Sequence, residues 1–275
     1  MTIDADDLKF NFGCASYGYK HQDPEGHIGK IPVDRIIQKL DSLFSCNNMK
    51  DAGELLDYWR KDALTLRDKQ GELTIVSEQM GYFRKTGEKE KALESISRGL
   101  TLIEELDMWD SVSAATIFLN AATTLKAFGK AEEALPLYKN TLSIYKENLP
   151  EDDLRFGGFY NNYALALTDL GRFQEAEEMY LSALKVVLPQ EKGRLDGAST
   201  YVNMAYLYEN WKGASCPEIP ACMAKGLTIL DDTRIPQDGY CAFVLSKCAP
   251  AYRHFGMEDI AQRLTQRSEV LYARH

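Results

Sequence analysis

Hydrophobic residues recur at intervals of three and four positions in successive stretches of the chain. Four stretches share this spacing: Phe118, Ala121, Ala122 and Leu125; Tyr160, Tyr163, Ala164 and Leu167; Tyr201, Met204, Ala205 and Tyr208; and Leu245, Cys248, Ala249 and Tyr252. Residues three and four apart lie on the same face of an α-helix. After a glycine, a second stripe follows, as in Ala134, Tyr138 and Leu142. The pattern predicts a succession of helices, each with one buried face.

This helical pattern repeats about every 42 residues. The segments A-F-G-K-A-E-E-A-L-P-L-Y and D-L-G-R-F-Q-E-A-E-E-M-Y match with Gly129 over Gly171, a displacement of 42. Glycines occupy the corresponding place in five units: Gly87, Gly129, Gly171, Gly213 and Gly256. Four units have alanine five residues later (Ala92, Ala134, Ala176 and Ala261), and the fifth has Ile219 in an insertion with proline. Each repeat is therefore expected to be helix, turn, helix, with the glycine at positive φ where the first helix ends.

The expected fold class is all-α, a right-handed α-solenoid (superhelix) of about six helix-turn-helix repeats. The predicted units are a degenerate first pair at 32–70 and repeats at about 71–110, 111–150, 153–190, 194–232 and 237–274. An atypical first pair is expected because one side of a terminal repeat faces water. Residues 1–31 have no period and are expected to form an irregular N-terminal arm, and 32–275 a single solenoid domain.

These repeats resemble the tetratricopeptide repeat, whose pattern is W-x2-L-G-x2-Y…A-x3-F. The period of 42 exceeds the usual 34. Together with the run Y-N-N-Y-A-L-A-L-T-D-L-G-R-F-Q-E-A-E-E-M-Y at 160–180, it looks most like the repeats of kinesin light chains and their bacterial relatives. The resemblance covers residues 73–275 and is closest over 115–188. It implies that the first helix of each pair lines a concave groove, in a family of transport adaptors, peptide sensors and assembly scaffolds.

Composition narrows the class of partner. The 275 residues include 41 acidic and 32 basic side chains, for a net charge of −9. Because the basic residues are dispersed, neither nucleic acid nor an anionic membrane is an expected partner. No apolar run approaches the roughly 20 residues of a membrane span. The acidic start, MTIDADDLKF, does not resemble a signal peptide, and widely spaced cysteines favour reduced structural thiols, so we expect a cytoplasmic protein.

The chain offers little for catalysis. Of its four histidines, His21 and His27 lie in the arm, six residues apart, which excludes an i, i+4 metal pair on a helix. Cys14 with either of them would be a thiol and base without a supporting motif. No phosphate-binding glycine motif is present. We therefore expect no enzyme activity, no cofactor and no metal.

Three asparagines stand out on the predicted first helices. Asn120, Asn162 and Asn203 each lie two positions ahead of an alanine of the packing stripe. A carboxamide offers both a donor and an acceptor, which matches the backbone of an extended peptide. The resemblance adds that tetratricopeptide proteins often use asparagine at this position for that purpose. The alternative is that these side chains bond neighbouring backbone or water between helices.

Charged side chains surround this column. Basic Arg84, Lys85, Lys126, Lys247 and Arg253 share the predicted face with acidic Glu78, Asp169 and Glu209. A face more basic than the whole protein favours an acidic segment or a C-terminal carboxylate as ligand, and the alternative is a solvated charged surface. The full set of predicted groove residues is Asn120, Asn161, Asn162, Asn203, Arg84, Lys85, Lys126, Tyr206, Lys247 and Arg253.

The function predicted from these features is a non-catalytic scaffold or adaptor that captures an extended, acidic peptide or protein segment. A second hypothesis is an intracellular peptide-sensing regulator whose solenoid changes conformation on binding. Two further hypotheses are self-assembly through the exposed ends of the solenoid and occupation of the groove by the arm through its acidic segment D-A-D-D at 4–7. An enzyme that uses the arm would lose activity when residues 1–31 are deleted.

Overall fold

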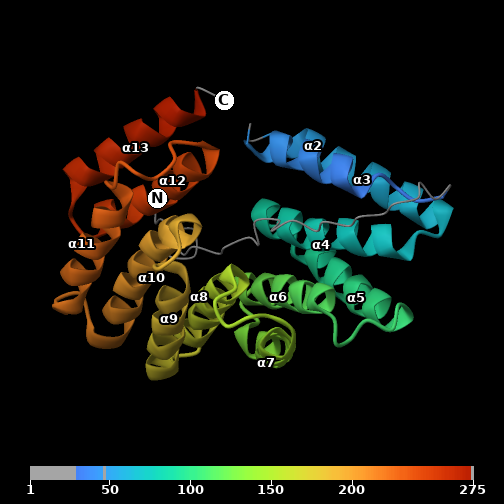
Figure 1. Cartoon of the computed structure of the whole chain (residues 1–275), viewed down its shortest axis with the longest axis horizontal. Coiled ribbons are helices and arrows are strands. Elements are labelled where there is room, and N and C mark those ends of the chain that lie inside the picture. Colours follow the sequence, from blue (N-terminus) through green and yellow to red (C-terminus); the bar gives the residue numbers. More distant parts are fainter. Residues whose placement is uncertain (1–28, 46–47, 274–275) are drawn as a thin grey trace. The chain divides into compact units, whose positions relative to one another are not determined.

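The computed structural model describes residues 29–45 and 48–273, and the regular structure of this part is helical (Figure 1). It contains twelve α-helices and one short 3-10 helix, with no strand among the described residues. The all-α prediction is confirmed. Nearly all of the predicted N-terminal arm, including Cys14, His21, His27 and the D-A-D-D segment, lies outside the described residues.

The described residues divide into two compact units, one ending at Asn148 and the other beginning at Leu149. The first unit holds three helix pairs: α2 (Val33–Ser45) with α3 (Met49–Leu66), α4 (Lys69–Thr86) with α5 (Lys89–Glu105), and α6 (Val112–Ala127) with α7 (Ala131–Asn148). Within it, α3 also packs on α4, and α4 on α6.

The second unit also holds three helix pairs. They are α8 (Leu154–Asp169) with α9 (Phe173–Val187), α10 (Arg194–Lys212) with α11 (Glu218–Leu230), and α12 (Gly239–His254) with α13 (Glu258–Tyr272). The 3-10 helix η1 (Glu191–Gly193) precedes α10, which packs on both α8 and α12. The six helix pairs fall close to the predicted intervals, although α4 begins at Lys69, inside the interval predicted for the first pair. The single domain over 32–275 stays a prediction.

The turn glycines adopt the backbone conformation that the repeat pattern predicts. All five have φ between 71° and 88°: Gly87, Gly129, Gly171, Gly213 and Gly256. At Gly87 the ψ of 16° completes a left-handed cap, whereas at Gly213 the ψ of 166° extends the chain into the insertion before α11. Glycine suits these places because a Cβ atom disfavours positive φ.

The small residue after each turn lets the two helices of a pair approach closely. Ala92, Ala134, Ala176 and Ala261 are completely buried, and so are Tyr138 and Tyr180 one helical turn later. Packing a small side chain beside a large one fills the space between helices at the density of protein interiors. The tyrosines contribute most of the area, since aromatic side chains carry the largest apolar surface.

Side chains also define where several helices begin. Asp68, Ser111, Asp153 and Asp238 precede α4, α6, α8 and α12 and accept hydrogen bonds from the first turn. These oxygens satisfy amide groups that have no partner within the helix. Every first helix after α2, except α10, therefore starts at a polar cap, which fixes the register of the surface these helices share.

The four described cysteines, Cys216, Cys222, Cys241 and Cys248, are buried free thiols, as predicted. Burial raises the pKa of Cys222 to about 11, so this thiol stays protonated near neutral pH. Within the described residues, no helix combines the length and apolar character required to cross a membrane.

Candidate functional site

The first helices of successive pairs lie against one another and form a shared surface in each unit, which we call the first-helix face. In the first unit it belongs to α4 and α6, and in the second to α8, α10 and α12. The predicted groove residues all lie on these helices: Arg84 and Lys85 on α4, Asn120 and Lys126 on α6, Asn161 and Asn162 on α8, Asn203 and Tyr206 on α10, and Lys247 and Arg253 on α12.

The asparagines bond within the protein. Nδ2 of Asn120 donates to Oγ of Ser77 on α4 at 2.8 Å, and Nδ2 of Asn203 donates to Oδ1 of Asn161 on α8 at 3.1 Å. Asn162 instead donates from Nδ2 to the carbonyl oxygen of Gly158 in its own helix at 3.0 Å. Two of the three column asparagines therefore join adjacent repeats.

Burial separates Asn120 from the other two. Asn162 and Asn203 are each 1% exposed, and Asn161 is completely buried, whereas Asn120 keeps partial exposure. Buried amide groups favour hydrogen-bond partners, and the Nδ2 groups of the three column asparagines find theirs between and within helices. These contacts correspond to the alternative interpretation of the column. Direct contact of the asparagines with a peptide stays a prediction.

The cations of the first unit differ in accessibility. Nη1 of Arg84 donates to Oγ1 of Thr123 on α6 at 2.7 Å. Lys85 is exposed, with Nζ 5.2 Å from the centre of the Phe44 ring. Lys126 is only 3% exposed, which leaves little of it for a ligand. Of the predicted cations on this face, Lys85 is therefore the most accessible.

Glu78 lies on the same face as Arg84, and its carboxyl group carries less than a full negative charge near neutral pH. Burial raises the pKa of Glu78 to about 7, the nearby Asp41 carboxylate adds to the rise, and Arg84 opposes it. A carboxyl group with such a pKa is partly protonated at neutral pH. Sequence reasoning counts Glu78 as a full negative charge, because its surroundings have no signature in the sequence.

In the second unit, Lys247 is exposed on α12, with Nζ 5.8 Å from the centre of the Phe243 ring. Arg253 is also exposed, and its Nε lies 3.1 Å from both carboxylate oxygens of Glu258. That ion pair reduces the net charge that Arg253 offers to a ligand. Lys247 is thus the most accessible of the predicted cations in the second unit, as Lys85 is in the first.

Tyr206 belongs to an aromatic cluster between α10 and α12. It is 6% exposed, and its ring centroid lies 5.3 Å from that of His254 and 5.1 Å from that of Phe255. Nε2 of His254 lies 2.8 Å and 3.0 Å from the carboxylate oxygens of Glu209. The cluster joins the two first helices, so Tyr206 contributes packing beneath the predicted groove.

Sequence analysis did not identify Asp196, a buried carboxyl group at the start of α10. It is 7% exposed and accepts a hydrogen bond from the hydroxyl of Tyr240 on α12. Burial raises the pKa of Asp196 to about 6, and the hydrogen bond from Tyr240 opposes the rise. The 44-residue separation of the pair is close to one repeat, which is the signal that could have found it.

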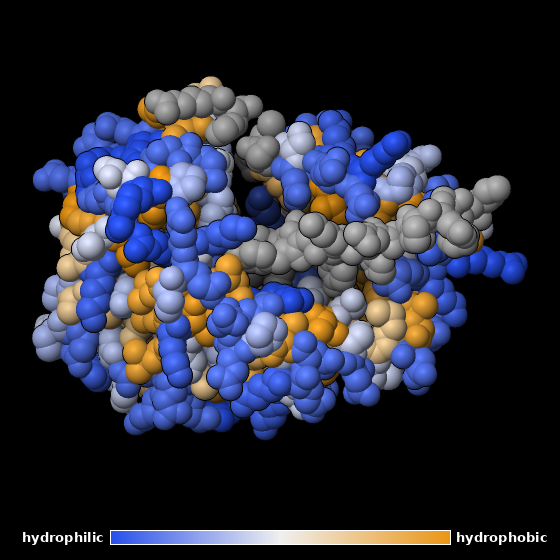
Figure 2. All heavy atoms as spheres, in the orientation of Figure 1, coloured by the Kyte–Doolittle hydropathy of each residue, from blue (hydrophilic) through white to orange (hydrophobic). Residues whose placement is uncertain are grey.

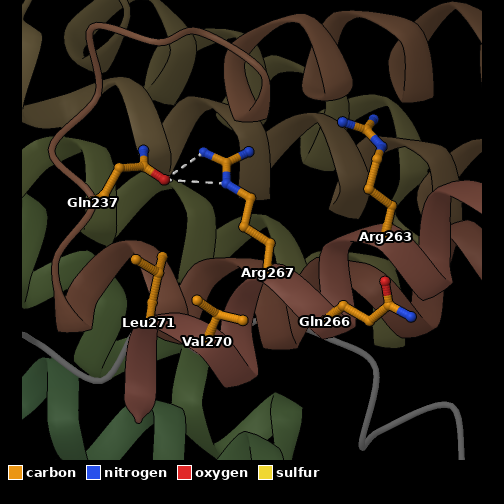
Figure 3. A pocket seen from close by; sticks show the side chains of 6 residues that line it. All are labelled: Gln237, Arg263, Gln266, Arg267, Val270 and Leu271. Atoms are coloured by element: carbon orange, nitrogen blue, oxygen red, sulfur yellow. Dashed lines mark hydrogen bonds between the residues drawn. The ribbon is translucent and has the colours of Figure 1, made fainter. Parts of the chain in front are cut away.

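A shallow hollow of about 380 Å³ lies beside α13 (Figure 3) and is lined by Gln237, Arg263, Gln266, Arg267, Val270 and Leu271. Nε and Nη2 of Arg267 donate to Oε1 of Gln237 at 3.1 Å and 2.9 Å. Arg263 donates to both carboxylate oxygens of Asp231. Both guanidinium groups are committed to the protein, so the hollow is a weak candidate for an anion site. The described residues contain no group of three or more metal-ligating side chains.

The sequence profile of the tetratricopeptide repeat family matches residues 114–154 and 159–187, which span the pairs α6–α7 and α8–α9. Over these residues the chain carries tetratricopeptide repeats. No curated protein sequence matches it significantly.

Solved structures extend the comparison of the tetratricopeptide fold. The nearly identical TPR-like repeats of Podosopora anserina, assigned to a kinesin light chain, match with a TM-score of 0.51 and 16% identity, covering 72% of this chain and 94% of that one. BtubC (BKLC) from P. vanneervenii matches with a TM-score of 0.49 and 19% identity, covering 89% of this chain and 92% of that one. At such identities, the match to the Podosopora repeats supports a likeness of fold alone.

Proposed function

We propose that this tetratricopeptide-repeat protein is a non-catalytic scaffold that binds an extended, acidic segment of a partner protein along its first-helix faces. The fold supports the general part of this proposal, because repeats of this kind present adjacent helices as an extended surface for protein interactions. A cytoplasmic location is part of the proposal.

The observation that carries the acidic preference is the pair of accessible cations. Lys85 and Lys247 are exposed on the first-helix faces of their units, and each ammonium group lies over an aromatic ring. Glu78 adds less repulsion than a normal carboxylate, because its pKa is about 7. An acidic segment would therefore meet positive charge and weakened negative charge on the first unit's face.

The asparagines Asn120, Asn161 and Asn203 have a positioning role in this proposal. The Asn203–Asn161 bond holds α10 against α8, and the Asn120–Ser77 bond holds α6 against α4. Replacing them would disturb helix packing as well as any contact with a ligand. Exposed cations give a cleaner test, because reversing their charge leaves the buried contacts in place.

The test begins with affinity capture from native lysate and peptide mapping, which define the bound segment. Binding of the synthetic segment is then measured by fluorescence anisotropy with a variant that carries Lys85→Glu and Lys247→Glu. We expect a loss of affinity of about tenfold or more, because each unit's first-helix face then presents a carboxylate to an acidic segment in place of an ammonium group.

A matched control carries Lys139→Glu and Lys185→Glu, which change the net charge equally but lie exposed on the second helices α7 and α9. This control should bind as the unmodified protein does. Equal affinity for all three proteins, or an equal loss in both variants, would show that the first-helix faces do not bind the segment. Small-angle scattering with and without the segment distinguishes a scaffold, whose radius stays constant, from the sensing alternative.

A further inference from the structure

Helix α3 presents an exposed stripe that carries both apolar and charged side chains. Tyr58 is 61% exposed and Leu64 is 51% exposed, more than most large hydrophobic residues of the described chain. The stripe consists of Lys50, Glu54, Asp57, Tyr58, Lys61 and Leu64, all of them exposed. Ala52, Leu56 and Ala63 of the same helix are buried, and α3 packs on α2 and α4. Asp57 also accepts a hydrogen bond from Nε2 of Gln79 on α4 at 3.3 Å, so it lies at the edge of the stripe. The other members lie on the side of α3 that its neighbours leave open.

The spacing of this stripe is that of a helix-pairing seam. Lys50, Glu54, Asp57, Lys61 and Leu64 alternate steps of four and three residues, which keeps them in line along one face. Tyr58 stands beside this line and packs edge-on against Trp59, with ring centroids 5.1 Å apart. A helix with such a seam can place it against a second helix of matching pattern.

The charges of the seam are complementary to themselves in one orientation. When a second copy of α3 lies antiparallel, with the two-fold axis at the level of Trp59, Asp57 lies opposite Lys61 of the second copy, and Lys61 opposite its Asp57. Leu64 then lies at the level of Glu54 of the second copy and can cover its methylene groups. The two Tyr58 rings meet beside the axis. A parallel arrangement in the same register would bring each charge against its own kind.

We propose that the exposed stripe of α3 is an interface at which two copies of this chain associate as a two-fold symmetric dimer. We infer a second copy of the chain as the partner because the charges of the stripe complement themselves, and a symmetric interface requires a self-complementary surface. Contact through one helix face places the interface toward the small end of the usual size range, so the dimer forms reversibly and depends on concentration. The proposal is independent of peptide binding on the first-helix faces.

Charge reversal tests the proposed pairing directly. Sedimentation velocity of the full chain, from low micromolar to sub-millimolar concentration, measures the dimer fraction. Asp57→Lys alone and Lys61→Asp alone should each raise the dimer Kd by about tenfold or more, because each creates two like-charge pairs. The double variant Asp57→Lys/Lys61→Asp should dimerise as the unmodified chain does. An equimolar mixture of the two single variants should form the heterodimer in preference to either homodimer.

The rescue by the double variant and by the mixture separates loss of pairing from loss of folding. Circular dichroism and thermal melting verify that each variant is folded. Lys139→Asp, at an exposed position of α7, is the control for a change in net charge. A chain that stays monomeric over the whole range would overturn the proposal. So would single variants that dimerise normally, folded variants that show no rescue, or a dimer that responds to Val270→Ser on α13 and not to changes on α3.

Discussion

Two of the three column asparagines bond to a side chain about one repeat earlier in the same unit. Asn120 donates to Ser77 and Asn203 donates to Asn161, across separations of 43 and 42 residues that are close to the repeat period. Asn162 instead donates to the carbonyl oxygen of Gly158 four residues earlier, a bond typical of short polar side chains within helices.

Asp196 gives a prediction about stability and pH. Burial raises the pKa of its carboxyl group to about 6 in the folded protein, from an ordinary value of 3.8. A raised pKa means that the folded state binds the proton more tightly, so the stability from this group is full below pH 3.8 and is lost as pH rises toward 6. Asp196→Asn stays neutral and can still accept the hydrogen bond from Tyr240. At pH 8 we expect the variant to be more stable by about 1–3 kcal/mol.

Urea unfolding at pH 8 and at pH 4.5 measures this difference. The gain should shrink at the lower pH, where the native carboxyl group is largely protonated. Asp259→Asn, on the exposed surface of α13, is the matched control and should show no comparable pH-dependent gain. A stability difference between Asp196→Asn and the unmodified protein that is equal at both pH values would contradict the assignment.

How much of the candidate site the sequence predicts depends on the interaction concerned. Period and helical spacing place the asparagines and the lysines on first helices, because both follow from local geometry. Burial of Lys126, and the pKa of Glu78, depend on side chains that are distant in sequence and meet in space. The pairing of Asn161 with Asn203 is intermediate, since residues one period apart in adjacent first helices are expected neighbours.

At the scale of the elements, replacing a turn glycine and replacing a helix glycine by alanine should change the stability of the protein in opposite directions. Gly129 has a φ of 75° after α6, so Gly129→Ala forces a Cβ atom into a strained conformation although no atom lies within 4 Å of it. We expect it to cost about 1 kcal/mol. Gly81, inside α4, also has open space around the added Cβ but has helical φ. Gly81→Ala should therefore stabilise by about 0.5–1 kcal/mol.

Thermal and urea unfolding of the two single variants measure these effects on one scale, since both add the same methyl group. If Gly129→Ala stabilised the protein as Gly81→Ala does, the positive φ at the turn would not be a requirement of the fold.

Among the turn glycines, Gly213 has a backbone conformation that the sequence period does not predict. Its place in the sequence matches the other glycines, yet its ψ of 166° follows from the proline-containing insertion before α11.

At the scale of the whole molecule, the period predicts six helix pairs because each pair forms from contacts that are local in sequence. In a repeat protein, stability is close to a sum over repeats and the interfaces between neighbours. The units that end at Asn148 and begin at Leu149 each contain three pairs and a set of fully buried side chains of their own, such as Tyr138 in the first and Tyr252 in the second. The sequence repeat continues across this division without a change of period, so the sequence does not predict the division.

Three pairs are about the minimum at which stacked repeats bury a continuous core, so residues 149–275 should fold when expressed alone. We expect a helical circular dichroism spectrum and one cooperative urea transition. A fragment of residues 191–275 is the matched comparison: it keeps two pairs but loses α8 and α9, on which α10 packs. Its transition midpoint should be clearly lower, because the face of α10 that bonds through Asn203 becomes exposed. If the three-pair fragment were unfolded, the stability of this unit would depend on residues before 149, and the expectation that it folds alone would be wrong.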